Sequence, residues 1–211
     1  MNCGACGRAC SNANTATLGC TDGLCDSTCQ SGFLNLNRPV APTPDDGCEL
    51  AAHRVFVTST AINANFGGFA GADAACQQHA NTAGLGGTWM AWLSDEASTP
   101  AARFTKSLVP YVLVDGTPIA ASWSALTTNM APAVAIELDE NGTNVGVSEV
   151  WTATNPDGTL TTGTSFCVDW TSNLQSDVTT VGRADLATSQ WTDVFQQTCE
   201  RNNVRLFCFE Q

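Results

Sequence analysis

The chain has 211 residues and a formal net charge of −12 at pH 7. Only 13% of its residues are charged, about half of the ~25% that is usual in soluble domains. Nucleic acids, anionic membranes and sulfated, heparin-type polyanions are bound through clustered cations, so this composition argues against all three as partners. The length fits one ordinary domain with a small appendage.

The eleven cysteines predict a disulfide framework and therefore an oxidising compartment, outside the cell or at its surface. The first twenty residues lack the apolar segment of a secretory signal peptide, so we expect that such a signal was removed or lies outside this chain. No run of 18 apolar residues is present, and we expect no membrane insertion.

The cysteines divide the chain into two predicted domains, a disulfide-stapled module at residues 1–50 and a larger domain at residues 51–211. The first zone has almost no aliphatic periodicity, so crosslinks must replace a core there. It contains seven cysteines, namely Cys3, Cys6, Cys10, Cys20, Cys25, Cys29 and Cys48.

In the second zone, hydrophobic patterns predict short strands and one clear helix. The helix is expected over residues 72–83, where alanines and Cys76 share one side and Gly84 ends it. Asn141-Gly142 predicts a hairpin turn, and the final strand is expected to be the closing central one. The expected strands cover residues 54–59, 89–93, 111–114, 134–138, 145–147 and 204–209. This pattern indicates an α+β domain.

A series of short motifs, from His53 to Gln211, gives the second zone a family resemblance. The motifs are Gly71-Ala72-Asp73, Cys76, Gly84-Leu85-Gly86-Gly87-Thr88, Ala91-Trp92-Leu93-Ser94, Ser122-Trp123-Ser124-Ala125-Leu126, Val150-Trp151, Asn155-Pro156-Asp157-Gly158, Phe166-Cys167-Val168-Asp169-Trp170, Cys199 and Leu206-Phe207-Cys208-Phe209-Glu210. In this order and spacing the chain resembles endostatin, the carboxyl-terminal domain of certain collagens, and its bacterial relatives. The resemblance implies a disulfide-bonded variant of the C-type lectin-like fold.

The resemblance also implies two disulfides, Cys76–Cys208 and Cys167–Cys199. The alternative use of these four cysteines is a zinc site. It is disfavoured because the spacing has neither a Cys-x-x-Cys pair nor a nearby pair of histidines.

The first zone is similar to a short cysteine-rich repeat of secreted bacterial proteins, which usually has another cysteine where this chain has Leu36. The count of seven is therefore odd, and Cys48 is the candidate for an unpaired cysteine at an intermolecular contact. A rearranged pairing that leaves a different cysteine free is an equal alternative. The Cys3-x-x-Cys6-x-x-x-Cys10 run also fits an iron–sulfur or zinc ligand set, but an oxidising compartment favours disulfides.

A calcium site is one alternative for a loop that is similar to the ligand loop of C-type lectins, Asn155-Pro156-Asp157-Gly158. Trp191-Thr192-Asp193 is similar to a Trp-Asn-Asp triplet of the same family. The resulting set of oxygen ligands is Asn155, Asp157, Asp169 and Asp193, and such ligands suit Ca²⁺. The other reading is an ordinary β-turn, with Pro at the second position and Gly at the last. No other cofactor is expected.

Catalysis is not expected, because none of the common nucleophile, metalloprotease or phosphate-loop motifs is present. A Ser–His–Asp triad is assembled in space, so it stays an alternative. Only His53 resembles the histidine segment through which endostatin binds zinc, and His79 is expected to be a surface or packing residue. Most tryptophans are expected in the core, and Trp191, in a polar loop, is the candidate for an exposed ligand contact.

The resemblance predicts a secreted or surface-displayed bacterial protein with a non-enzymatic role in recognition or adhesion, bound to an extracellular protein or glycan. The heparin binding of endostatin depends on arginine patches and is not expected here. The alternative is a structural subunit of an extracellular filament or surface layer, with copies of itself as partners. A surface poor in charge and a leftover cysteine favour this alternative.

Overall fold

The computed structural model describes residues 3–4, 8–30, 33–35, 44–45, 47–48, 50–163 and 165–211. It divides into two compact units, Met1–His53 and Arg54–Gln211. The division falls close to the boundary that the cysteine distribution predicts after residue 50. Within the described ranges, no helix is long and apolar enough to cross a membrane.

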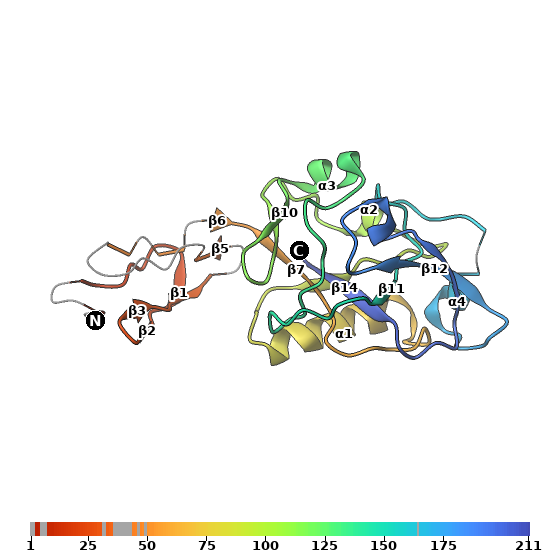
Figure 1. Cartoon of the computed structure of the whole chain (residues 1–211), viewed down its shortest axis with the longest axis horizontal. Coiled ribbons are helices and arrows are strands. Elements are labelled where there is room, and N and C mark those ends of the chain that lie inside the picture. The colour runs from red at the N-terminus through yellow and green to blue at the C-terminus, as the bar shows by residue number, and fades with distance from the viewer. Residues whose placement is uncertain are drawn as a thin grey trace. The chain divides into compact units, whose positions relative to one another are not determined.

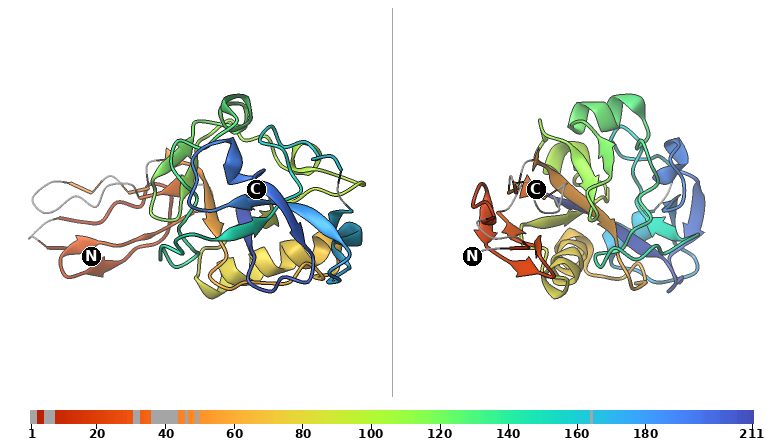
Figure 2. Two further views of the ribbon diagram at one scale, coloured as in Figure 1. Left: turned by 45° about the vertical axis from the view of Figure 1, so that its right-hand side comes forward. Right: turned by 60° about the vertical axis from the view of Figure 1, so that its left-hand side comes forward.

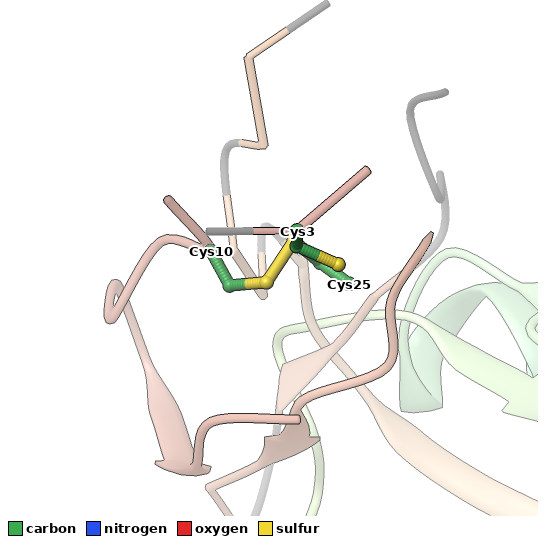
Figure 3. A group of neighbouring side chains, drawn as sticks. All are labelled: Cys3, Cys10 and Cys25. Carbon is green, nitrogen blue, oxygen red and sulfur yellow. A yellow bond between two sulfur atoms is a disulfide. The ribbon is translucent and has the colours of Figure 1, made fainter. Parts of the chain in front are cut away.

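The first unit consists of short antiparallel strand pairs tied by disulfides. The pairs are β1 (Thr15–Thr17) with β4 (Thr28–Cys29), β2 (Cys20–Thr21) with β3 (Leu24–Cys25), and β5 (Phe33–Leu34) with β6 (Leu50–Ala51). The disulfides are Cys3–Cys20, Cys10–Cys25 and Cys29–Cys48. Cys3, Cys10 and Cys25 are buried and lie together as its small apolar cluster (Figure 3). Crosslinks therefore take the place of a core, as the composition predicts.

The prediction that Cys48 is the unpaired cysteine was wrong. Cys48 is buried and forms a disulfide with Cys29. Backbone contacts explain the pairing, because Cys48 N donates to Ala13 O at 3.0 Å and Asn14 Nδ2 donates to Cys48 O at 2.8 Å. These bonds hold residue 48 beside the strand pair that carries Cys29. The five disulfides use ten of the eleven cysteines, and the eleventh, Cys6, lies outside the described residues.

An odd number of cysteines leaves one sulfur of the 211-residue chain without a partner in the same chain. We expect non-reducing electrophoresis of the native chain to show a dimer that reductant removes. Because the other ten cysteines are paired within the chain, Cys6→Ser alone should abolish the dimer. Substitution of Cys48 should not be required for this effect. A strictly monomeric chain with one alkylatable thiol would contradict this prediction.

The second unit is built on an eight-stranded sheet whose central strand is β14 (Arg205–Glu210). The strand order is β10 (Pro118–Ala120), β9 (Tyr111–Leu113), β7 (His53–Val57), β14, β11 (Glu149–Trp151), β12 (Val178–Arg183) and β13 (Phe195–Thr198), and β8 (Trp89–Ala91) also pairs with β14. β14 is antiparallel to β7 and β8 and parallel to β11. The prediction of a central closing strand is confirmed. The first and last strands of the unit are neighbours, with Val55 opposite Phe209.

Alternating side chains of β7 and β14 separate two apolar clusters, one on each face of the sheet. Phe56 and Leu206 belong to the cluster that includes Ala72 of α1 (Gly68–Thr82). Val57 and Phe207 belong to the opposite cluster, which is covered by α3 (Trp123–Asn129). Figures 1 and 2 show α1 (yellow) and α3 (green) on opposite sides of the central strands. The short helix α2 (Pro100–Arg103) and the 3-10 turn η1 (Ser189–Trp191) complete an α+β fold.

Two buried disulfides tie the second unit together. Cys76 in α1 is bonded to Cys208 in β14 across a sequence separation of 132 residues. Cys167 is bonded to Cys199 across 32 residues. Both pairs are those that the resemblance implies.

The hairpin predicted around Asn141-Gly142 is present as a turn but not as two strands. Gly142 N donates to Asp139 O, and the only bridge between the two arms is Leu138 with Asn144. Leu138 O, which points away from the other arm, accepts a hydrogen bond from Val57 N at 3.0 Å. The chain before the turn therefore also packs against β7.

The segment α4 (Phe166–Trp170) is a left-handed helical turn, with φ between 47° and 63° at all five residues. This conformation costs roughly 1–2 kcal/mol per residue for L-amino acids, so the surrounding structure must impose it. Cys167 is fixed by its disulfide to Cys199, and the Trp170 ring is stacked on Phe66 at 5.3 Å between centroids. Covalent and aromatic anchors at both ends of the turn hold this backbone in place.

Candidate functional site

Polar side chains from three separate segments line a surface groove of about 420 Å³, which we call the polar groove. The loop after β7, the outer side of α1 and the turn at residues 139–142 supply these side chains. The lining residues are Ser59, Thr60, Gln78, His79, Thr82, Glu140 and Asn141. Two smaller depressions share residues with it, one through Glu140 and Asn141 and the other through Thr60, Gln78 and His79.

Glu140 is the buried centre of the polar groove, with a side chain only 5% exposed. Its Oε2 accepts a hydrogen bond from Ser59 N at 2.9 Å, and its Oε1 accepts one from the Ser59 hydroxyl. His79 Nδ1 lies 2.7 Å from the same Oε1. Burial alone would raise the pKa of Glu140, but the hydrogen bonds from His79 and Ser59 together outweigh it and lower the pKa to about 2. Glu140 is therefore a carboxylate at neutral pH.

Thr60, His79 and Glu140 form a row of hydroxyl, imidazole and carboxylate. Thr60 Oγ1 lies 3.1 Å from His79 Nε2, and His79 Nδ1 faces Glu140. An ionised carboxylate can only accept hydrogen bonds, so Nδ1 carries the proton. In the neutral imidazole, Nε2 then has a lone pair that accepts the Thr60 hydroxyl proton.

The fold fixes each member of this row through its neighbours. Thr58 Oγ1 donates to Thr60 O at 2.8 Å, and Leu206 N donates to Thr58 Oγ1 at 3.1 Å, which ties the loop after β7 to the central strand. His79 lies one turn of α1 beyond the disulfide-bonded Cys76. The turn that carries Glu140 is closed by Asp139, whose Oδ1 accepts hydrogen bonds from two backbone N–H groups.

Sequence reasoning missed this row. His79 was expected to be a surface or packing residue, but it lies between a hydroxyl and a buried carboxylate. The three residues are 19 and 61 positions apart, so no local motif marks them. A usable signal would have been the position of His79 on the exposed edge of the predicted helix.

The candidate calcium ligands are held in separate local roles. Asn155 Nδ2 donates to Leu160 O at 2.8 Å, and Asp157 Oδ1 accepts from Thr159 N at 2.9 Å, so both side chains stabilise a turn. Asp169 is exposed on α4, and Asp193 is exposed after η1. The interpretation of residues 155–158 as an ordinary β-turn therefore accounts for Asn155 and Asp157.

Among the residues that the structure describes, the only group of three potential ligands within 4.8 Å of one another is Cys3, Cys10 and Cys25 (Figure 3). All three sulfurs are in disulfides and are not available as thiolates. The carboxylates of Asp157, Asp169 and Asp193 do not meet in such a group. The structure therefore assembles neither the calcium set nor a zinc set in this part of the chain.

Removal of divalent cations is expected to leave stability unchanged. A metal that binds only the native state would raise the melting temperature, but Asn155 and Asp157 are already engaged within their own turn. Differential scanning fluorimetry in EDTA and in millimolar Ca²⁺ should give the same melting temperature. A Ca²⁺-dependent rise that Asp157→Asn removes would contradict this expectation.

The prediction that Trp191 is exposed was wrong, since its side chain is fully buried. Its ring lies 4.8 Å from that of Trp92 and 5.5 Å from that of Phe207. The polar residues around it turn outward on η1, and the indole fills the cluster on the α3 side of the sheet. The polar neighbours of Trp191 therefore indicate a turn, but they do not predict the direction in which the indole side chain points.

Buried hydroxyls form a hydrogen-bonded network beneath the loops. Thr192 Oγ1 accepts from Trp92 Nε1 at 2.7 Å and donates to Thr154 O at 3.0 Å. Thr152 Oγ1 donates to Thr192 O at 2.6 Å, and the Ser94 and Thr154 hydroxyls are 2.8 Å apart. Thr192, the middle residue of the Trp191-Thr192-Asp193 triplet, therefore forms hydrogen bonds within the protein interior and does not face a ligand.

Thr192→Val is expected to lower the free energy of unfolding by about 2–3 kcal/mol, because it leaves Trp92 Nε1–H buried without an acceptor. Val and Thr have similar shapes, so packing changes little. Urea unfolding followed by tryptophan fluorescence would measure the loss. Thr128→Val, at an exposed position of α3, is the control and should be nearly neutral. Equal stability of the two variants would show that the network contributes little.

The second unit is thus a disulfide-bonded α+β domain with a polar groove at one edge of α1. A family model described as a protein of unknown function (DUF1554) matches residues 59–190. The match spans more than half of the chain, so the chain belongs to this family. No curated protein matches it. The whole polar groove lies within the matched residues.

Proposed function

We propose that residues 54–211 form an endostatin-like recognition domain of C-type lectin-like fold, which binds an extracellular protein or glycan. Two features support this fold. The first and last strands of the unit are paired, and the disulfides Cys76–Cys208 and Cys167–Cys199 are the two that the resemblance implies. With the chain ends on adjacent strands, the loops at the other edges are free to vary for binding.

The five disulfides support a location outside the cytoplasm. Both disulfides of the second unit are buried, and Cys76, Cys167, Cys199 and Cys208 have no exposed surface. The domain therefore needs an oxidising compartment to reach its native state. We propose that the protein acts in the extracellular space or at the cell surface.

The polar groove carries the proposal, because it offers free hydrogen-bonding side chains on a rigid frame. The amides of Gln78 and Asn141 are exposed and can each donate and accept. Glu140 is the groove's carboxylate, and it is already engaged by Ser59 and His79. These groups suit the carbonyls and N–H groups of a peptide or the hydroxyls of a sugar. The loop at residues 155–158, used in lectins, is not the proposed binding surface.

Glycan and peptide arrays probed with the labelled full chain would test this proposal. The double variant Gln78→Ala/Asn141→Ala should lose the array signals that the native chain gives. The matched control Asn129→Ala/Gln190→Ala removes two exposed amides elsewhere and should retain them. Binding that is unchanged by the groove variant would contradict the proposed surface.

The filament alternative has a separate readout. Size-exclusion chromatography and negative-stain microscopy of the native chain should show discrete particles if recognition is the function. Ordered polymers, together with blank arrays, would replace the recognition proposal by a structural one.

A further inference from the structure

We infer that Thr60 is an activated nucleophile and that the polar groove catalyses acyl transfer from small, uncharged esters. This activity goes beyond the proposed recognition role. It rests on three side chains that meet in the order that nucleophilic catalysis requires: a hydroxyl, an imidazole and a buried carboxylate.

The distances match the role of each group. His79 Nε2 is 3.1 Å from Thr60 Oγ1, within the reach that a general base needs. His79 Nδ1 is 2.7 Å from Glu140 Oε1, which orients the ring and stabilises the imidazolium that forms during attack. Only the hydroxyl end of the row is open, since Thr60 is exposed whereas Glu140 is buried.

Glu140 is held by hydrogen bonds from two neighbours, Ser59 and His79. Ser59 supplies both its backbone N–H and its hydroxyl to the carboxylate. The carboxylate therefore stays ionised and keeps the proton of the imidazole on Nδ1. The lone pair on Nε2 remains directed at Thr60, which is the tautomer that a general base must have.

Donors for a developing oxyanion lie next to the nucleophile. Among the described residues, the backbone N–H groups of Thr60 and Ala61 have no acceptor. In known acyl-transfer sites the N–H of the nucleophile and a neighbouring N–H bind the oxyanion. Thr60 lines the groove of about 420 Å³, which admits a small acyl group, and Ala61 lines the neighbouring depression that shares Thr60 and His79 with the groove. The net charge of −12 disfavours anionic substrates, so a neutral ester is the fitting class.

The proposed reaction needs no reactant other than the ester and water. Thr60 Oγ1 attacks the acyl carbon as its proton passes to His79 Nε2. The bond from the acyl carbon to the alkoxide oxygen then breaks, and the alkoxide takes the proton from Nε2 and leaves as an alcohol. Water attacks the acyl-Thr60 ester and gives its proton to His79. The acid is released as Thr60 recovers its proton.

The test uses the full chain with p-nitrophenyl acetate and with a fluorophosphonate probe followed by peptide mass spectrometry. The native chain should hydrolyse the ester above the buffer rate and carry one adduct, on Thr60. Thr60→Ala and His79→Asn should each remove the adduct and lower the rate at least ~100-fold. Thr60→Ser keeps the hydroxyl and should retain both.

Two controls separate catalysis from loss of structure. Thr128→Ala and His53→Asn change a surface threonine and the only other histidine and should leave rate and adduct unchanged. Thr60 is exposed, so Thr60→Ala should keep the native near-ultraviolet circular dichroism. A folded native chain without adduct, or a label that persists in Thr60→Ala, would overturn the inference. The array test rests on Gln78 and Asn141, and the ester test rests on Thr60 and His79. A native chain that binds on the arrays but carries no adduct would keep the recognition proposal while this inference fails.

Discussion

Replacing both Cys76 and Cys208 by alanine is expected to lower the free energy of unfolding by about 5 kcal/mol. The bond closes a loop with a sequence separation of 132 residues, nearly the whole second unit. In the chain-entropy description, crosslinking a loop of this length removes about 5 kcal/mol of conformational freedom from the unfolded state. A loss of this size is comparable to the total stability of many domains, so much of the variant should unfold at physiological temperature.

Tryptophan fluorescence makes the measurement specific to the second unit, because all six tryptophans lie within residues 89–191. The matched variant Cys167→Ala/Cys199→Ala opens a loop of 32 residues and should cost less, about 4 kcal/mol. Urea titrations of both variants and of the native chain would give the order of stability. A smaller loss for the Cys76/Cys208 variant would show that loop length does not set the contribution of these bonds.

Four strands of the sheet, β7, β8, β9 and β14, and the main helix were predictable from sequence because their patterns are local. The other four strands were not predicted, and the strands expected at residues 134–138 and 145–147 did not form. β14 has consecutive apolar residues, which only a strand buried on both faces accommodates. α1 shows its buried side through Ala72, Cys76 and Ala80, spaced by one turn each. The predicted start of α1 is four residues late. Gly67 precedes the helix and Gly68 is its first residue, but neither glycine is a helix-start signal in the sequence.

Several features of the site depend on tertiary structure and carry no local signal. The direction of the Trp191 side chain is decided by the aromatic cluster around Trp92, not by its polar neighbours. The partner of Cys48 is decided by hydrogen bonds to residues 13 and 14. The left-handed turn at residues 166–170 follows from anchors far away in the sequence. The groove itself needs three segments that only the folded sheet brings together.

The contribution of Glu140 to stability should be present near neutral pH and disappear in acid. Its pKa is about 2 in the folded chain against an ordinary value of 4.5. Between these values the unfolded chain binds a proton that the folded chain does not, so falling pH favours unfolding. The contribution is complete above about pH 4.5 and is lost as the pH falls towards 2. The shift corresponds to about 3 kcal/mol.

Comparison with Glu140→Gln isolates this effect from the other carboxyl groups, including Asp139 beside it and Asp115 across the neighbouring depression. The amide cannot accept from Ser59 and His79 on both sides, because its nitrogen is a donor. At about pH 6 the variant should be roughly 3 kcal/mol less stable than the native chain, and the gap should shrink progressively at about pH 4 and pH 3. Urea unfolding at each pH measures it. A gap that stays constant from neutral to acid pH would mean that the carboxylate charge does not stabilise the fold, and that the bonds from Ser59 and His79 act only as neutral contacts.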